Sequence, residues 1–168
     1  MGITRVVLVG DTHAYSWEEV HPRVREAVGE ADIAVHAGDI VRQAVVDGFR
    51  AAARRAFVVH GNSDPPDLRS TLPDRQVFEV DGVRIGVTHP AWGGPEFEPE
   101  ELLPDFHGGV DVILYGHLHE PVNEWRRDVL FLNGGQPYSQ FLLPVTIAWL
   151  IIEDGVPRGE IELVELPR

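Results

Sequence analysis

The chain contains no cysteine among its 168 residues. This absence excludes disulfide bonds, thiolate zinc sites and cysteine nucleophiles, and it leads us to expect a cytoplasmic protein. Lysine is absent as well, so all fourteen basic residues are arginines. We attribute that bias to genome composition, and it indicates no mechanism.

Long hydrophobic runs are also missing. The longest, residues 141–152 (FLLPVTIAWLII), is well short of the roughly 20 residues that a membrane span needs. It is rich in β-branched residues and contains a proline, so it predicts a buried strand entered from a turn. The amino terminus, MGITRVVLVGD, reaches an acidic residue too early to supply the apolar region of a signal peptide. We therefore expect a soluble protein that makes no membrane contact.

Positive charge is scarce, and the formal net charge is −13 with neutral histidines. Proteins that follow long nucleic acids usually carry a basic stripe. No such stripe runs along this sequence, which argues against extended nucleic acid as a partner and favours a small or metal-bridged substrate. A homo-oligomer stays open as an alternative to a monomer.

The first two-thirds of the chain alternates between strand-like and helix-like periods. Three apolar runs have the length of buried strands, and they span residues 5–10, 31–39 and 56–62. Helices are expected over residues 16–28 and 42–54. In the first of them, Ser16 and Glu19 have the spacing of a capping box, although Pro22 would also suit a first helical turn. This βαβαβ order predicts parallel strands.

The rest of the chain is richer in strands. The sequence QVFEV-DG-VRIGVTH predicts a hairpin, and VDVILYGHLH predicts a further buried strand. Between them, residues 90–104 are expected to form a loop with a short helical turn. The segments after residue 122 look like antiparallel strands. The expected fold is one α/β domain over residues 1–168, with two packed mixed β-sheets flanked by helices.

Polar side chains gather where five of these strands end. The set comprises two carboxylates, one amide and four imidazoles: Asp11, His13, Asp39, Asn62, His89, His117 and His119. The carboxyl ends of parallel strands line one crevice, and residues i and i+2 of an extended segment point the same way. These groups are ligands for divalent manganese, iron, nickel or zinc. Seven exceed the need of one metal, so we expect two metals that share a carboxylate, with Asp39 as the central bridge.

The glycines before three of these residues fit sharp turns at the strand ends, and they are Gly38, Gly61 and Gly116.

The ordered motifs D-x-H, GD, GN, a lone H and GHxH resemble those of the calcineurin-like metallophosphoesterases. They read here as DTH, GD, GN, His89 and GHLH, they cover nearly the whole chain, and its short length is similar to that of the YfcE-type phosphodiesterases. The resemblance implies a four-layer α/β/β/α sandwich and two divalent metal ions, with manganese first among the candidates. It implies one metal on Asp11, His13, Asp39 and His119, and a second on Asp39, Asn62, His89 and His117.

By the same resemblance the protein is a dinuclear phosphoesterase, and specifically a phosphodiesterase. A hydroxide bridging the metals would attack phosphorus in line with the leaving group. The catalytic residues implied are Asp39, Asn62, His89 and His117. A non-catalytic scaffold on the same fold, like the retromer subunit of this family, is the alternative.

Two positions depart from the family pattern. Many relatives have a histidine directly after GN that suits general-acid work, whereas this chain has Ser63. A serine hydroxyl is a poor acid near neutral pH, so we expect a preference for esters with good leaving groups, such as aryl phosphodiesters. Pro90 follows His89 where relatives commonly have glycine, and it biases His89 toward extended backbone.

Several other residues have two readings from sequence. His36 and His60 are expected to be hydrogen-bonded core residues or supports for the ligands. Asp64 either orients a ligand or caps a turn. The NGGQ sequence at 133–136 is either a turn beside the site or only a hairpin turn. Trp92 either lines a substrate cleft or packs under its loop.

Overall fold

Ten strands form two five-stranded sheets in the computed structural model, which describes residues 2–90, 97–140 and 142–167. In spatial order, the first sheet consists of β10 (Val156–Glu165), β9 (Val145–Glu153), β1 (Ile3–Val9), β2 (Ile33–His36) and β3 (Ala56–Val58). The second consists of β4 (Arg75–Val80), β5 (Val83–Thr88), β6 (Val112–Tyr115), β8 (Val129–Asn133) and β7 (Val122–Arg126). Both sheets mix parallel and antiparallel pairs, as expected from the sequence.

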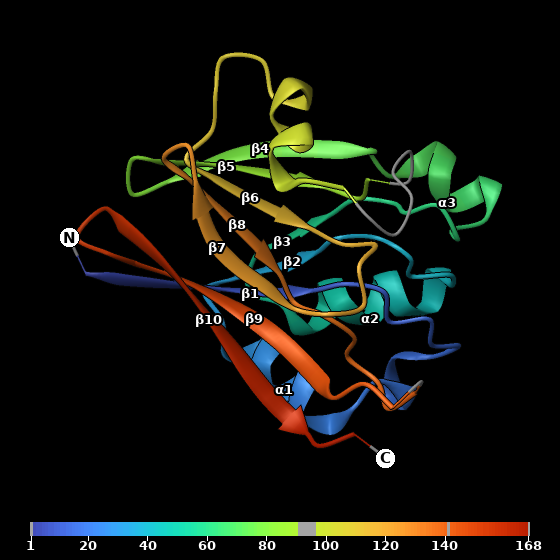
Figure 1. The fold of residues 1–168 in the computed structure, drawn as a ribbon. Helices are drawn as coiled ribbons and strands as arrows, with labels where there is room; N and C mark the ends of the chain where they lie inside the picture. The colour runs from blue at the N-terminus through green and yellow to red at the C-terminus, as the bar shows by residue number, and fades with distance from the viewer. Residues whose placement is uncertain (1, 91–96, 141, 168) are drawn as a thin grey trace.

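Helices cover the outer faces of the two sheets (Figure 1). α1 (Pro22–Glu30) and α2 (Gln43–Ala52) lie on the first sheet, and the 3-10 helix η2 (Pro99–Asp105) lies on the second. The short α3 (Pro66–Thr71) follows the third strand. The layers are therefore helix, sheet, sheet and helix, which confirms the predicted sandwich. No helix within the described residues is both long and apolar enough to cross a membrane.

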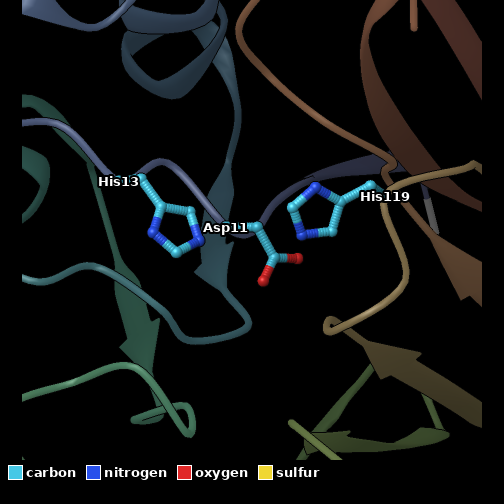
Figure 2. A group of neighbouring side chains, drawn as sticks. All are labelled: Asp11, His13 and His119. Carbon is cyan, nitrogen blue, oxygen red and sulfur yellow. The ribbon is translucent and has the colours of Figure 1, made fainter. Parts of the chain in front are cut away.

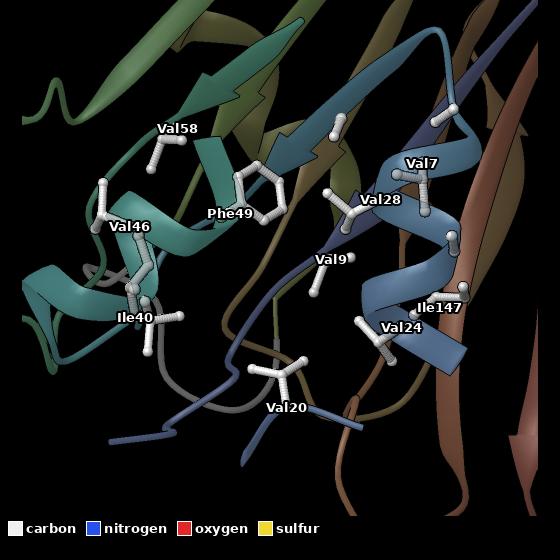
Figure 3. Packing of buried hydrophobic residues seen from close by; sticks show 14 of the residues in the cluster. Val7, Val9, Val20, Val24, Val28, Ile40, Val46, Phe49, Val58 and Ile147 are labelled. Carbon is white, nitrogen blue, oxygen red and sulfur yellow. The ribbon is translucent and has the colours of Figure 1, made fainter. Parts of the chain in front are cut away.

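The alternation of side chains along each strand builds this layering. In β1, Val7 and Val9 face α1 and α2, where they pack with Val24 and Val28 (Figure 3). Their neighbour Leu8 faces the second sheet. Successive strand residues point to opposite faces, so a strand covered on both sides must be apolar throughout. This explains the unbroken apolar runs of the sequence.

The packing between the second sheet and η2 follows the same rule. Ile113 and Tyr115 of β6 pack against Leu102 and Phe106 in and beside η2, whereas Leu114 faces the first sheet. Burying each such side chain contributes roughly 1.5–3 kcal/mol. Three apolar layers thus fix the two sheets against each other and fix the positions of their strand ends.

The first helix begins later than the capping-box prediction placed it. Ser16 makes no side-chain cap, and Trp17–Glu19 form only the 3-10 turn η1. α1 begins at Pro22, and the side chain of His21 accepts the hydrogen bond of Arg23 N. Proline suits this position because the first helical N–H groups have no partner inside the helix. The capping-box prediction was wrong, and the alternative start at Pro22 is the observed one.

The prediction of antiparallel strands after residue 122 holds for β7, β9 and β10 but not for β8. β8 pairs antiparallel with β7 and parallel with β6. A hairpin places β7 at the sheet edge, so β8 turns back into the sheet beside β6. The sequence shows the hairpin, but it does not show which strand lies on the other side of it.

Candidate metal centre

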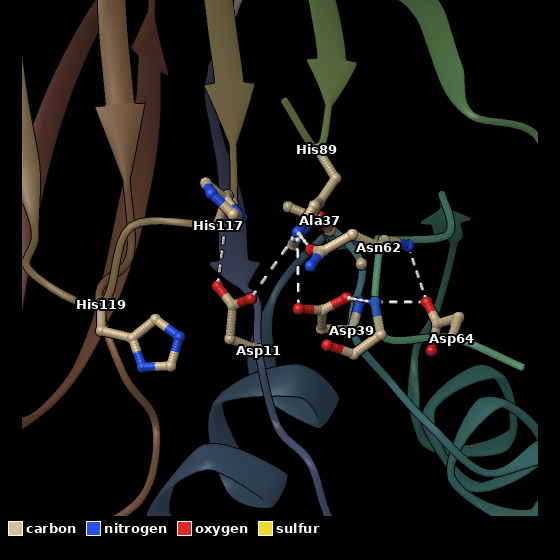
Figure 4. Close-up of polar contacts among 12 residues, drawn as sticks. Asp11, Ala37, Asp39, Asn62, Asp64, His89, His117 and His119 are labelled. Atoms are coloured by element: carbon tan, nitrogen blue, oxygen red, sulfur yellow. Dashed lines mark hydrogen bonds and ion pairs between the residues drawn. The ribbon is translucent and has the colours of Figure 1, made fainter. Parts of the chain in front are cut away.

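The seven polar residues singled out from the sequence come together at one end of the molecule, where both sheets end. Figure 4 shows six of them, and His13 lies beside Asp11 and His119 (Figure 2). β1, β2 and β3 of the first sheet precede Asp11, Asp39 and Asn62, and β5 and β6 of the second precede His89 and His117. The sequence argument expected a crevice along one parallel sheet. The structure corrects this, because the ligand-bearing strand ends face each other across the layer between two sheets.

The backbone that carries these side chains is not extended. Residues with positive φ are rare outside glycine, yet four of the seven have it: Asp11 (54°), His13 (50°), Asp39 (59°) and His117 (80°). The extended geometry on which the i, i+2 argument depended is therefore wrong, although Asp11 and His13 do face the same group of ligands. Hydrogen bonds between the strand-end loops hold the left-handed turns instead, from Asp11 N to Gly38 O (2.9 Å) and from His13 N to Asp39 O (3.3 Å).

Two groups of possible metal ligands share one aspartate. The first group consists of Asp11, His13 and His119, whose ligand atoms all lie within 4.8 Å of one another. Figure 2 shows the carboxylate of Asp11 between the two imidazoles. Asp11, Asp39 and His89 form the second group by the same measure. Asp39 Oδ2 lies 3.7 Å from His13 Nε2 and 3.5 Å from His89 Nε2, so it also faces both groups.

The remaining two of the seven residues, Asn62 and His117, border the second group. Asn62 Oδ1 lies 2.7 Å from His89 Nε2, and the ring centroid of His117 lies 5.4 Å from that of His89. The backbone N–H of His117 donates to Asp11 Oδ2 at 3.1 Å. All seven residues are therefore in one cluster.

The hydrogen-bond chemistry of the cluster fits a cation. Asp11 Oδ1 is buried and has no hydrogen-bond partner within the described part of the chain. The Nδ1 atom of His89 lies 2.8 Å from Ala37 O and must donate to it. In the neutral ring, which burial favours, Nε2 therefore carries a lone pair although Asn62 Oδ1, also an acceptor, lies 2.7 Å from it. That nitrogen faces Asp39 Oδ2 at 3.5 Å and Asp11 Oδ1 at 4.0 Å. Acceptors that converge without a donor are costly unless a cation lies between them.

Burial shapes the protonation of the cluster. Burial first, and then the nearby charge of Asp39, raises the pKa of Asp11 well above its usual range. Burial lowers the pKa values of His13 and His89, which keeps both imidazoles neutral. Neutral imidazole is the form that binds metals, and a dication would restore the charged form of Asp11. The pKa directions thus agree with the hydrogen-bond geometry.

Gln136 orients His119. The side-chain N–H groups of Gln136 donate to Tyr138 O (2.8 Å) and Gln140 O (2.9 Å), so its Oε1 must be the acceptor for His119 Nδ1 at 2.8 Å. His119 Nδ1 therefore carries the proton and Nε2 carries the lone pair, as in many metal-binding histidines. The NGGQ segment is thus part of the site, although no feature of the sequence indicated this role for Gln136.

Asp64 ties two strand-end loops together. Its Oδ1 accepts from Ile40 N (2.7 Å) and Val41 N (2.6 Å), and its Oδ2 accepts from Asp39 N (3.0 Å) and Gly61 N (2.6 Å). Val41 has a φ of 77°, which is strained for a β-branched residue. Of the two readings from sequence, Asp64 is the residue that positions a ligand loop.

His36 is a support within the core, as expected. Gly38 N donates to its Nδ1 at 3.1 Å, and its Nε2 therefore donates to Thr12 Oγ1 at 3.1 Å. Complete burial lowers the pKa of His36 to about 3, so the ring is neutral at ordinary pH. His60 is half-buried, with Nδ1 3.4 Å from Gly61 O.

The three strand-end glycines serve close approach more than sharp turning. Gly38 has a φ of 102°, but Gly61 and Gly116 have no positive φ. A Cβ on Gly61 would meet Asp39 Oδ1 at 2.2 Å, and one on Gly116 would meet Ala37 O at 2.8 Å. The prediction of sharp turns therefore holds for Gly38 alone.

A pocket of about 370 Å³ opens onto the cluster. Its walls consist of His13, Asp39, Asn62, Ser63, His117, His119, Tyr138 and Gln140. The N–H of Ser63 donates to Asp39 Oδ1 at 2.7 Å, and Ser63 is exposed and lines the pocket. Trp92, considered from sequence as a cleft residue, lies outside the described residues.

The family follows from comparison with known proteins. Residues 4–155 match the model of the calcineurin-like phosphoesterase superfamily domain, and the chain belongs to that family. A probable metallophosphoesterase of Methanocaldococcus jannaschii, MJ0623, is 30% identical over 98% of this chain and 84% of its own length. The phosphodiesterase MJ0936 of the same organism is 25% identical over 79% of this chain and 83% of its own.

A solved structure shows the same fold at lower identity. Vacuolar protein sorting 29 from Cryptosporidium parvum superimposes with a TM-score of 0.77 over 98% of this chain and all of its own. It is 18% identical, so the likeness concerns the fold alone.

Proposed function

We propose that this protein is a dinuclear metal-dependent phosphodiesterase that hydrolyses small phosphoesters by in-line attack of water on phosphorus. The single observation that carries the proposal is the buried cluster of acceptors, in which Asp11 Oδ1 has no partner within the described chain and the lone pair of His89 Nε2 faces two carboxylates. The family match and the name of the relative MJ0936 support phosphoester chemistry.

Each residue has a role in this proposal. One cation is held by Asp11, His13, Asp39 and His119, and the other by Asp39, Asn62, His89 and His117. Manganese is the first candidate, with iron, nickel and zinc as alternatives. When bound, such a pair supplies an acidified water nucleophile and positive charge opposite the phosphoryl oxygens.

The protein itself orients these groups and one substrate oxygen. Ala37 O and Gln136 Oε1 fix the tautomers of His89 and His119, which keeps their lone pairs toward the cluster. The exposed Asn62 stands at the pocket wall, where its amide N–H can donate to a phosphate oxygen. Ser63 is a weak acid in the position next to it, which supports the preference for good leaving groups.

The alternative function is a non-catalytic scaffold on the same fold. The likeness to vacuolar protein sorting 29 supports it, but through the fold alone. A scaffold has no need of a complete ligand set, whereas every metal-ligand position of the metallophosphoesterase pattern is filled here. The filled pattern favours hydrolysis.

The test is hydrolysis of bis-p-nitrophenyl phosphate after removal of metals and reloading with Mn²⁺. Asp39→Ala and His117→Ala should each lower kcat/KM by at least about a hundredfold, because each removes a group that holds cations at the reacting phosphate. The matched controls are Asp67→Ala and His107→Ala, since both residues are exposed and outside the pocket. Both controls should retain wild-type activity.

Calorimetric titration with Mn²⁺ provides a second measurement. Two equivalents should bind per chain, and the alanine variants should lose at least one. An absence of turnover with manganese, iron, nickel and zinc alike would reject the phosphodiesterase and favour the scaffold. One equivalent in the wild type would reject the dinuclear site.

A further inference from the structure

A second pocket adjoins the one that opens onto the ligand cluster. It has a volume of about 290 Å³, and Tyr138 lies in the walls of both. Thr12 and Ala14 also line it, and these residues are the chain neighbours of Asp11 and His13. The second pocket therefore begins where the ligand-bearing loop after β1 ends.

Tyr138 stands at the border between the two pockets. Its ring is edge-on to His13, with centroids 6.0 Å apart, and edge-on to His119, with centroids 6.4 Å apart. Gln136, which orients His119, also donates to the carbonyl of Tyr138 at 2.8 Å. The border residue is thus held by the same side chain that orients a proposed ligand.

The walls of the second pocket differ in chemistry from those of the first. Alanine, valine, proline and the tyrosine ring give it apolar surface, and Glu19 and Glu165 are its acidic residues. His21 lies 3.9 Å from Glu165, and no arginine is among the described residues that line the pocket. Complementary charge attracts a ligand and like charge excludes it, so these walls suit an organic group without negative charge.

We propose that the second pocket holds one ester arm of a phosphodiester, and that this arm is an apolar group that is neutral or, preferably, cationic. The inference rests on the phosphodiesterase function proposed above and defines its substrate class. The phosphate group lies in the first pocket, and the ester arm attached to it extends across Tyr138 into the second. The glutamates disfavour arms that end in a further phosphate or carboxylate.

The charge of the arm can be tested with diesters that share the p-nitrophenyl leaving group. The arms compared are choline, its uncharged isostere 3,3-dimethylbutanol, and an alcohol of similar length that ends in a carboxylate. We expect kcat/KM to fall in that order, by about three- to fivefold at each step, since an ion pair at a solvent-exposed site has at most an effect of this size. The Glu19→Gln/Glu165→Gln double variant should bring the choline and dimethylbutyl diesters within about twofold. An equal rate for all three arms in the wild type would overturn the charge preference.

Occupancy of the pocket can be tested by filling it. Ser139 is an exposed residue of its rim, and Ser139→Trp should lower kcat/KM at least about tenfold for the choline and dimethylbutyl diesters relative to methyl p-nitrophenyl phosphate. Ser70→Trp, on the exposed face of α3 and outside both pockets, should leave the ratio unchanged. An unchanged ratio in Ser139→Trp would overturn the proposal.

A binding measurement separates this proposal from the phosphodiesterase proposal. Calorimetry on Mn²⁺-loaded protein should show phosphocholine binding at least about threefold tighter than 3,3-dimethylbutyl phosphate, with the difference lost in the double glutamine variant. If no diester is hydrolysed but this difference in binding is observed, the phosphodiesterase proposal fails and the pocket stands. If diesters are hydrolysed but neither the arm nor Ser139→Trp affects binding or rate, the pocket proposal alone fails.

Discussion

Replacement of Asp64 by asparagine should destabilise the protein strongly, although the side chain keeps its shape. The carboxylate accepts four backbone N–H groups at 2.6–3.0 Å, two on each oxygen. Asparagine retains one oxygen and places an NH₂ group against the other two donors. A buried donor without a partner costs about 1–3 kcal/mol, so two such donors give a loss of about 2–6 kcal/mol.

Urea unfolding in the presence of a chelator measures this loss without a contribution from bound metal. Asp67→Asn is the matched control, because Asp67 is exposed in the first turn of α3, where a charge contributes less than about 1 kcal/mol. Asp64→Asn should also weaken Mn²⁺ binding, since the released loop carries Asp39 and the strained Val41. A destabilisation of Asp64→Asn below about 1 kcal/mol would refute the view that this carboxylate holds the two loops.

Three further changes test other supports of the site. Gln136→Met removes the acceptor for His119 Nδ1, so Mn²⁺ affinity measured by calorimetry should fall about 10–100-fold. An unchanged affinity would contradict the assignment of the His119 proton to Nδ1. His36 has a folded-state pKa of about 3, below its unfolded value of 6.5, so only the unfolded state takes up a proton at His36 as the pH falls through 6.5. The metal-free wild type should therefore lose about 2 kcal/mol more stability between pH 7 and pH 5 than His36→Asn does. Equal losses in the two proteins would show that His36 is not the cause. Ser63→His supplies an imidazole acid at the pocket, so the ratio of kcat/KM for alkyl phosphodiesters to kcat/KM for aryl phosphodiesters should rise by about tenfold or more. If the wild type already hydrolyses alkyl monoesters faster than aryl diesters, it protonates the leaving group without such an acid and the reasoning is wrong.

The layers of the fold and the membership of the cluster could be predicted because each depends on a local pattern. An apolar run such as residues 5–10 has no polar face, so it must be covered on both sides wherever it lies. A polar residue directly after such a run must lie at a strand end. Neither inference requires knowledge of which strand lies beside which.

The backbone conformation at the site could not be predicted in the same way. Asp11, His13 and His117 adopt left-handed φ values, which are uncommon outside glycine even though Asp and His adopt them more often than most residues. Such values persist where surrounding hydrogen bonds over-determine them, and here those bonds come from loops 26 to 106 residues away in the chain. Strand periodicity is a property of neighbours in sequence, so it predicted extended geometry at these positions.

Sequence reasoning left the roles of the supporting residues open for a related reason. Asp64 and Gln136 bind mainly backbone groups or other buried side chains, and a backbone N–H or carbonyl carries no mark in the sequence. An aspartate after a GN motif is compatible with any turn. Its role becomes evident only when four amide groups from two loops are seen to point at it.

The distribution of the cluster over two sheets explains how so many unfavourable features can coexist in it. Asp11 is fully buried with a raised pKa, and Asp39 adds a second buried carboxylate facing it. Both carboxylates follow neighbouring strands of the first sheet, β1 and β2, and unpaired buried charge of this kind opposes folding. The apolar layer between the sheets brings the two sets of strand ends together regardless of that repulsion. The interior of the fold thus stabilises an arrangement of ligands that would separate on their own, and a pair of cations would relieve the repulsion that remains.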